Sequence, residues 1–327
     1  MPQNKPKLLD QIRHRIRVKN YSLATEKAYV HWAKKFILFH QKTHPKDMGK
    51  HEVETFLIHL AVDLDVAAST QNQALSAILF LYKEVLNTPL GWVRVEWAKK
   101  PERLPEVLSR HEIIVILSLM EGLPLLVSKL LYGCGLRLSE ATSLRIKDVD
   151  FQQKQIVVRG GKGQKDRTLP LPETITADLQ YQIDSARDLH YRDLQNGNGR
   201  APLPNRLSKK FPAAEKEWGW QFIFPSKTLS RNPRDENSPL YRFHIHPSTI
   251  QKGIKAAAKK ANLSKRVNPH IFRHSFATHL LEDGQDIRTI QTLLGHKDVR
   301  TTMIYTHVVQ RPHGVQSPLD RLFDQIG

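Results

Sequence analysis

Apolar residues repeat at helical spacing through the first part of the chain. Four sets show this spacing: Leu8, Leu9, Ile12 and Ile16; Tyr29, Trp32, Phe36 and Phe39; Val53, Phe56, Leu57 and Leu60; and Leu75, Ile78, Leu79 and Tyr82. Each set lies along one side of a helix, so its side chains can share a core. Ser22 is placed to cap the second helix, and Ser69-Thr70 opens the fourth. Residues 1–97 are therefore predicted to form a small helical bundle with its aromatic side chains inside.

The helical pattern stops in residues 98–108, which read AKKPERLPEVL. Two prolines and a run of charges are typical of a linker between domains. Ser109 and Glu112 then have the spacing of a capping box. In this motif the serine side chain accepts from the glutamate N–H, and the glutamate side chain accepts from the serine N–H. A second domain is therefore expected to begin at residue 109 and to extend to residue 327.

The second domain mixes helices with a short stretch of strand pattern. Pro124 is placed to open an apolar helix that Gly133 and Gly135 end. The segments 155–159 (QIVVR) and 168–171 (TLPL) alternate like strands, and glycines in the connection between them suit a tight turn. The expected fold class is mainly α with a small β-sheet, an α+β arrangement.

Polar caps and glycines divide the stretch near the C-terminal end into three predicted helices. Their boundary residues are Asn268, Pro269, Gly284, Asp286, Gly295 and Asp298. His270 and Arg273 are three residues apart and so share a helix face. His296 falls on the bend after a glycine, and Tyr305 near the end of the third helix. These four side chains can therefore converge on one ligand.

The chain carries a formal net charge of +18 and has a pI near 9.9, with 40% hydrophobic residues. Such a surplus of positive charge predicts a nucleic acid as partner, against the alternative of a ribosome-associated or merely basic protein. Residues 251–273 contain seven lysines and arginines and no acid, which favours a face that follows phosphates. The candidate DNA contacts are Arg13, Arg15, Arg17, Lys19, Lys209, Lys210, Lys252, Lys255, Lys259 and Lys260.

Cys134 is the single cysteine, so no disulfide can form within one chain, which fits a reducing compartment. The N-terminal residues contain no apolar leader, and no apolar run reaches membrane-spanning length. The expected location is the cytoplasm, without membrane contact.

A second set of polar residues fits the same phosphate chemistry. Arg137 follows Gly135, and Glu140, three residues on, is placed to hold its guanidinium as a phosphate clamp. Lys162 lies in the glycine-flanked turn, which lacks the spacing of a Walker loop. Each residue alone is also explained by a surface ion pair or a solvated charge. The combination with a histidine pair and a tyrosine, a possible covalent nucleophile, points to phosphoryl transfer.

These motifs resemble the tyrosine recombinases, the lambda-integrase family. The matching patterns are His270-x-x-Arg273, Leu294-Gly295-His296, a tyrosine nine residues after that histidine, and Gly135-x-Arg137-x-x-Glu140. The resemblance implies a catalytic set of Arg137, Lys162, His270, Arg273, His296 and the nucleophile Tyr305, with Glu140 in support. It also implies a 3′-phosphotyrosine intermediate, no cofactor and no metal. Further implications are two domains clamping DNA, a homo-tetramer in the synaptic complex and a monomer in free solution.

Residues 190–241 begin as a polar loop and end in dense aromatics. This stretch, including the run from Trp218 to Ser226 (WGWQFIFPS), resembles the insertion of one recombinase branch, the integron integrases, placed at about 190–224. The resemblance implies recombination of gene cassettes at integron sites, including folded single strands with protruding bases. Trp218, Trp220, His244 and His246 are the predicted base contacts. A local core is the alternative.

Other functions remain open at this point. A general phage-type or chromosome-resolving recombinase and a type IB topoisomerase use similar chemistry. A metal-dependent relaxase is suggested by His244 and His246, although no third ligand stands near them in the sequence. A DNA-binding protein without activity is the last alternative. Residues 311–327 hold a small amphipathic helix, expected to dock on a neighbouring protomer or on its own domain.

Overall fold

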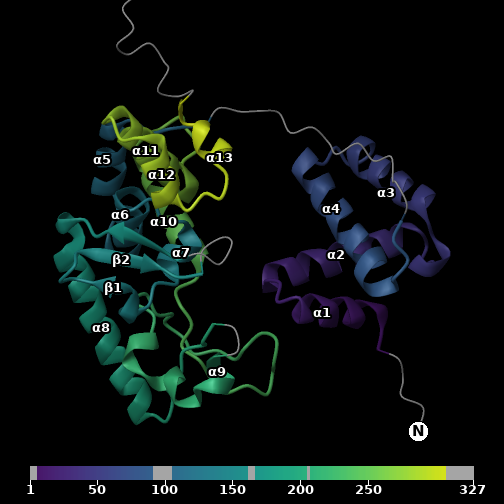
Figure 1. The fold of residues 1–327 in the computed structure, drawn as a ribbon, viewed down its shortest axis with the longest axis horizontal. Coiled ribbons are helices and arrows are strands. Elements are labelled where there is room, and N and C mark those ends of the chain that lie inside the picture. The colour runs from purple at the N-terminus through teal and green to yellow at the C-terminus, as the bar shows by residue number, and fades with distance from the viewer. Residues whose placement is uncertain (1–5, 91–104, 161–165, 205–206, 307–327) are drawn as a thin grey trace, which may run out of the picture. The chain divides into compact units, whose positions relative to one another are not determined.

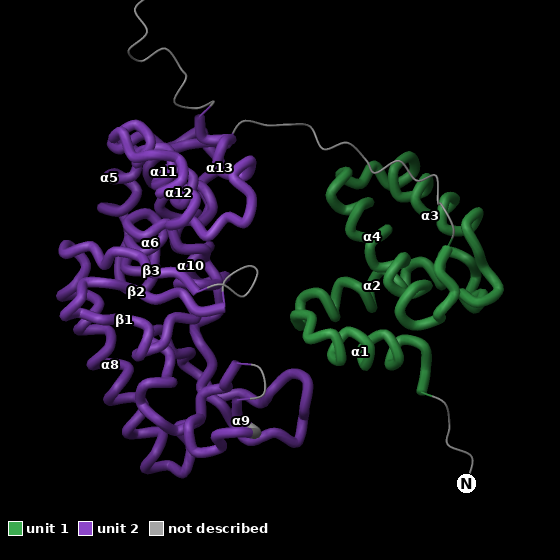
Figure 2. The backbone as a smooth tube through the Cα atoms, viewed as in Figure 1, with its two compact units in different colours: residues 1–103 green, residues 104–327 purple. Residues whose placement is uncertain are grey.

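The computed structural model describes residues 6–90, 105–160, 166–204 and 207–306, which fall into two compact units, residues 1–103 and 104–327 (Figure 2). Lys162, most of the predicted linker and the predicted C-terminal helix lie outside the described residues, as does the side chain of Lys209. The assignment of residues 1–97 to DNA binding and of residues 109–327 to catalysis stays a prediction.

The first unit consists of helices whose apolar sides meet in a core, as predicted. The helices are α1 (Leu8–Val18), α2 (Leu23–Phe39), α3 (Lys50–Val62) and α4 (Ala68–Phe80), and α4 continues into a π-helical turn, η2 (Leu81–Leu86) (Figure 1). The Ser22 hydroxyl accepts a hydrogen bond from the Thr25 N–H, which confirms the predicted cap of α2. Trp32 and Phe36 are buried with Phe56.

The second unit is mainly helical with a small antiparallel sheet (Figure 1). Its helices are α5 (Arg110–Ser118), α6 (Gly122–Gly133), α7 (Leu138–Thr142), α8 (Thr176–Gln195), α9 (Leu207–Lys210), α10 (Pro247–Lys260), α11 (Pro269–Glu282), α12 (Ile287–Leu294) and α13 (Arg300–Met303). The strands are β1 (Val149–Asp150), β2 (Gln155–Val158) and β3 (Arg167–Pro170), in the order β1-β2-β3. The predicted α+β class is confirmed.

Helix α6 is the centre of the core of this unit. It packs against α10 and α11, and its buried Leu130 and Leu131 join Ile156 and Leu169 of the sheet in one apolar cluster. In the sheet, Ile156 of β2 lies opposite Leu169 of β3, so both point to the core side. Burial on this scale is the main stabilising contribution to such a unit.

Local signals placed most of the helix boundaries correctly. The Ser109–Glu112 capping box is present, Asn268 and Asp286 cap α11 and α12, and Gly295 ends α12 with φ +62°. Helix α6 begins at Gly122, so that Pro124 lies in its first turn, where its missing N–H costs no hydrogen bond.

The predicted loop from residue 190 is wrong in its first part, because α8 continues to Gln195. The buried residues of α8 include Leu179, Ile183 and Ala186, and their helical spacing continues through His190 and Asp193. Because those last two residues are polar, the apolar repeat in the sequence stops before them, and the end of the helix was not recognised. Both side chains are buried because they have partners within the unit.

Candidate active site

Glu140 is the centre of a cluster of arginines. Its carboxylate accepts hydrogen bonds from Arg137 Nη1 at 2.7 Å and from the Arg137 N–H at 2.8 Å. Arg167 binds it through both terminal nitrogens, at 3.1 and 2.7 Å, and Arg273 Nη1 lies 3.9 Å away. Burial alone would raise the pKa of Glu140, but the hydrogen bonds from Arg167 and Arg137 outweigh it and hold the pKa at about 2. A partly buried carboxylate therefore binds Arg137 and Arg167 directly and forms a longer ion pair with Arg273.

Gly135 brings two of these arginines together. Its φ of +62° favours glycine, and a Cβ there would lie 2.4 Å from the Phe276 ring. The turn at Gly135 leads the chain into Arg137, the N-cap of α7, and the Gly135 carbonyl accepts a hydrogen bond from Arg273. Any other residue at this position would strain the turn and force the Phe276 ring to move.

Arg273 is 4% exposed and its guanidinium is surrounded by acceptors. Its Nη1 donates to the carbonyl of Gly135, and its Nη2 donates to the carbonyl of Leu294. Burial, with the charge of Arg137, lowers the pKa of Arg273 to about 10, so it stays protonated at neutral pH. The side chain is a fixed positive charge with a set orientation.

His296 lies beside Arg273, on the bend that Gly295 forms after α12. Its Nε2 is 3.2 Å from Arg273 Nη2, and its Nδ1 is 2.9 Å from the Thr302 hydroxyl. Because a guanidinium only donates, Nε2 accepts and the ring hydrogen is assigned to Nδ1. Burial, followed by the charge of Arg273, lowers the pKa of His296 to about 4, so the ring is neutral at pH 7.

Tyr305 lies at the end of the same stretch and is 1% exposed. Its ring packs in a small apolar cluster with Phe276, Ile290 and Leu294. Its hydroxyl is 2.9 Å from His274 Nδ1. Burial raises the pKa of Tyr305 to about 12, although Arg273 and Arg137 act to lower it. The phenol is therefore protonated and lies within the field of both arginines.

His270 lies in the first turn of α11 and is more exposed than His274, the next histidine on this helix. Partial burial lowers its pKa, and so do the charges of Arg273 and Arg137. Its ring centroid lies 6.5 Å from that of His274. The structure thus brings Arg137, Glu140, His270, Arg273, His296 and Tyr305 into one cluster.

Two members of the cluster, Arg167 and His274, were not predicted. Arg167 begins β3 and reaches Glu140 across the unit, and no local pattern distinguishes it from a solvated charge. His274 had a usable signal, because it lies four residues after His270 and so shares its helix face.

The predicted DNA contacts on α10 are exposed. Lys252, Lys255, Lys259 and Lys260 lie on its solvent side, while Ile250 and Ile254 are buried on the other. The four predicted DNA contacts of the first unit are each paired with an acid. Arg13 binds Asp10, Arg17 binds Glu26, and Arg15 and Lys19 share Glu84. All eight stay predictions as DNA contacts.

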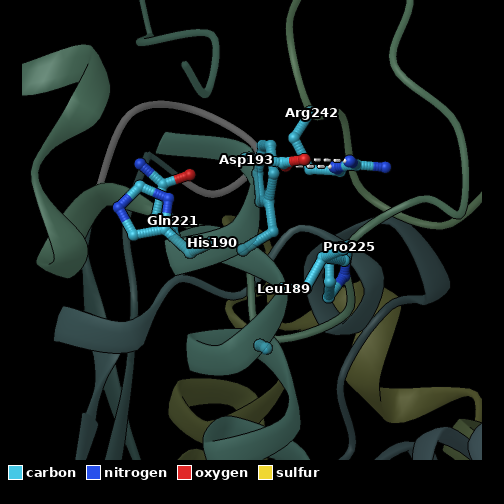
Figure 3. Close-up of a pocket in the computed structure, with 8 residues that line it drawn as sticks. Leu189, His190, Asp193, Gln221, Pro225 and Arg242 are labelled. Carbon is cyan, nitrogen blue, oxygen red and sulfur yellow. Dashed lines mark hydrogen bonds and ion pairs between the residues drawn. The ribbon is translucent and has the colours of Figure 1, made fainter. Parts of the chain in front are cut away.

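The aromatic insertion is a folded lobe, and Figure 3 shows the small pocket where it meets α8. Asp193 of α8 binds Arg242 through two hydrogen bonds, of 2.7 and 2.5 Å, beside a small cavity lined by His190 and Gln221. Arg145 donates to the carbonyls of Trp220 and Pro202. These contacts join residues 193–242 to the rest of the unit.

The four predicted base contacts of the lobe differ in their surroundings. Trp218 packs on the main core next to His190, and His244 packs edge-on against Phe222. His246 is exposed and caps α10, and Trp220 is half-buried with the Lys147 ammonium 2.8 Å from its ring centroid. Trp218 and His244 are partly buried against these neighbours, and the assignment of all four residues as base contacts stays a prediction.

Within the described residues, no group of three His, Cys, Asp or Glu side chains has the arrangement of a metal site. The histidine pair of the relaxase alternative, His244 and His246, therefore has no third ligand there. No helix in the part of the chain that the structure describes is long and apolar enough to cross a membrane.

Comparison with known proteins assigns both units. A model of the phage integrase family matches residues 107–311, and a model of the phage integrase N-terminal SAM-like domain matches residues 8–92. An integrase/recombinase of Escherichia coli is 47% identical over 323 residues, covering 98% of this chain and 95% of that protein. Tyrosine recombinase XerA of Pyrococcus horikoshii is 36% identical over 214 residues, which cover 65% of this chain and 60% of XerA.

Two solved structures share the fold. The XerH site-specific recombinase bound to a difH substrate, before cleavage, has a TM-score of 0.60 at 20% identity, and the match covers 93% of this chain and 82% of that one. A lambda integrase dimer bound to a COC' core site has a TM-score of 0.60 at 16% identity, with 93% and 95% covered.

Proposed function

This chain belongs to the phage integrase family and is a site-specific DNA recombinase of the tyrosine recombinase type, and from that premise we propose how its own residues act and which sites it joins. The observation that carries the proposal is the cluster around Glu140, which combines fixed positive charges with a tyrosine hydroxyl. The tetramer of the synaptic complex, the free monomer and the cytoplasmic location stay predictions.

Arg137 and Arg273 bind the nonbridging oxygens of the scissile phosphate, and His296 assists them. Charge builds up on these oxygens as the phosphorus is attacked, so donors that are already fixed stabilise the transition state without reorganising. Glu140 supplies that rigidity, because its side chain is only 10% exposed and binds Arg137 directly. To donate to phosphate, His296 Nε2 must gain a hydrogen, and the Thr302 hydroxyl can then donate to Nδ1 instead.

Tyr305 is the nucleophile of the proposed reaction. Its oxygen attacks the phosphorus, the bond from phosphorus to the 5′-oxygen breaks, and a 3′-phosphotyrosine and a free 5′-hydroxyl result. The phenolic proton leaves as the oxygen attacks, His270 assists its loss or orients the phosphate, and Lys162 gives a proton to the 5′-oxygen. The phosphodiester energy is retained in the tyrosine ester, so the joining step needs no cofactor.

Lys162 is proposed as the acid because of its place in the hairpin. The strand that follows its turn begins with Arg167, and Arg167 binds Glu140, the partner of Arg137. The start of β3, where the described part of the hairpin resumes, therefore lies at the arginine cluster.

The variant Lys162→Ala is expected to cleave normal DNA about 10²- to 10⁴-fold more slowly, the usual contribution of a general acid. Replacing the leaving 5′-oxygen by sulfur should restore most of the rate, because a thiolate leaves without a proton. Single-turnover cleavage of a nicked suicide substrate measures both rates. The matched control is Lys154→Ala, which removes an exposed lysine paired with Glu173 on the same sheet. A variant that sulfur does not rescue assigns the acid to another residue.

The lobe at 190–246 supports a finer proposal, that the sites are integron sites, including folded single strands. A loop that is only a connection needs no internal bracing, whereas this lobe is held by the Asp193–Arg242 pair, by Arg145 and by an Arg200–Glu215 ion pair of 2.9 Å. Such a frame can present side chains at fixed positions to protruding bases, which stacking on flat groups retains.

The rings of the lobe that remain accessible are the candidates for stacking. Phe211 is exposed next to Lys210, whose ammonium lies 5.3 Å from the ring centroid, and it is the more open of the two. Trp220 is half-buried, and the Lys147 ammonium lies against one face of its ring. Both rings thus have a cation beside them for the neighbouring phosphates.

The variant Phe211→Ala, or Trp220→Ala, is expected to lower recombination of a folded single strand about tenfold or more, from the loss of one stacked base. Cleavage of a plain duplex suicide site should change less than about threefold, since the arginine cluster is untouched. Tyr181→Ala is the control, because Tyr181 is an exposed ring on α8 outside the lobe. Equal losses on both substrates would make the lobe a structural brace and favour a general recombinase.

A further inference from the structure

The hydrogen bond between Tyr305 and His274 has no role in the reaction described above. His274 lies on α11 next to Arg273, and its Nδ1 is 2.9 Å from the Tyr305 hydroxyl. We propose that His274 is a positioning residue, which accepts the phenolic hydrogen of Tyr305 and thereby holds the nucleophilic oxygen in place for attack. This inference rests on the proposed role of Tyr305 as nucleophile.

The direction of this hydrogen bond follows from the chemistry of the pair. Burial raises the pKa of Tyr305 to about 12, and burial together with His270 and Arg273 lowers the pKa of His274 to about 4. At neutral pH the phenol therefore keeps its proton and donates it, and the neutral imidazole accepts at Nδ1 and carries its own hydrogen on Nε2. The lone pairs of the phenol oxygen stay free.

An isolated phenol in a phosphate site would donate to the nearest phosphate oxygen, because charged acceptors form the stronger hydrogen bonds. That contact would turn the O–H, instead of a lone pair, toward the phosphate. With its hydrogen bound to His274, Tyr305 cannot make the unproductive contact. Its ring is held between Phe276, Ile290 and Leu294, so the orientation of the hydroxyl is fixed at both ends of the side chain.

A purely structural hydrogen bond is the competing explanation, and the chain contains a matched pair that represents it. On the same helix, His279 Nδ1 lies 2.9 Å from the Tyr132 hydroxyl, and both rings are buried or nearly so. The two histidine–tyrosine pairs share the helix and the distance of 2.9 Å from Nδ1 to the hydroxyl, and they differ in the tyrosine that they hold. A general effect of losing such a bond would appear in both.

The test is single-turnover cleavage of a nicked suicide duplex by the full chain. His274→Leu removes the acceptor and is expected to slow covalent adduct formation about 100-fold, the size of a small misplacement of a reacting group. His274→Asn places an amide oxygen near the position of Nδ1 and should stay within about tenfold of the wild type. His279→Leu should cleave at the wild-type rate within about threefold, and all three should bind the duplex with unchanged affinity.

A spectroscopic measurement separates positioning from loss of folding. With tyrosine labelled at Cζ with ¹³C, the Tyr305 resonance is the one that Tyr305→Phe removes. It should shift in His274→Leu, return toward the wild-type position in His274→Asn, and stay in place in His279→Leu. The inference is overturned if His274→Leu cleaves like the wild type, or if His274→Asn is as slow as His274→Leu. An adduct still formed by Tyr305→Phe would instead overturn the nucleophile assignment.

Discussion

Replacing Tyr305 by phenylalanine is expected to abolish covalent attachment to DNA, with adduct formation reduced by more than about 10³-fold. The phenol oxygen is the atom that we propose joins phosphorus, and no neighbouring side chain can take its place while the ring remains packed with Phe276 and Leu294. Denaturing gel electrophoresis of the protein after incubation with a nicked suicide substrate measures the adduct. Affinity for the same DNA should change little, because the substitution removes one oxygen atom.

Two other tyrosines provide the comparison for this variant. Tyr241→Phe removes a hydroxyl that lies 3.4 Å from Glu215 in the lobe, and Tyr132→Phe removes one bound to His279 on α11. Both variants should form adduct at the wild-type rate. An adduct made by Tyr305→Phe but lost in Tyr241→Phe would move the nucleophile to Tyr241.

The second large effect is expected from Glu140→Gln. The neutral amide cannot accept from Arg137 and Arg167 as the carboxylate does, and it leaves guanidinium groups buried without a counter-charge. We expect a loss of about 3 kcal/mol in the free energy of unfolding, since a pKa held at about 2 instead of 4.5 corresponds to that stabilisation. Cleavage should slow about 100-fold, because Arg137 and Arg273 lose their orientation.

The dependence on pH identifies Glu140 as the source of this stability. A carboxylate with a lowered pKa stabilises the folded protein above its unfolded pKa, and that contribution disappears as the pH falls from about 4.5 toward 2. Urea unfolding across this range should show the loss in the wild type and a flatter profile in Glu140→Gln. The control is Glu112→Gln, since Glu112 is also the glutamate of a capping box and binds Lys265, far from any of these arginines in the sequence. Equal slowing of cleavage by both variants would contradict the role of Glu140.

Sequence reasoning succeeded where the cause of a structure is local. Asn268 and Asp286 cap helices through the next few backbone N–H groups, and Gly295 ends α12 through its own φ. A few neighbouring residues in the sequence were therefore enough to predict these helix boundaries. The family motif supplied the rest of the cluster. Arg167 was missed because its partner, Glu140, is 27 residues away and reached only through the fold.

In the aromatic lobe, the sequence could not predict which side chains are exposed. A tryptophan or histidine in a polar stretch can be open to a ligand or covered by a neighbour, and the sequence does not distinguish the two. Trp218 packs in part on the main core and His244 lies edge-on against Phe222, whereas Phe211 is exposed. The exposure of each ring depends on the path of the chain between Asp193 and Arg242. The buried ion pair between these two residues, which are far apart in the sequence, helps to set that path.

The last described residues of the chain make two contacts with histidines that have different tasks. Thr302 binds Nδ1 of His296, the proposed phosphate ligand, and Tyr305 binds Nδ1 of His274. Three residues separate these contacts along the backbone, so a small movement of this segment breaks both together. In an enzyme that cleaves DNA, a half-assembled site would leave the nucleophile free while the phosphate is unsupported. Because one short segment makes both contacts, the phosphate ligand and the nucleophile are either both in place or both displaced. The site is then either complete or inactive.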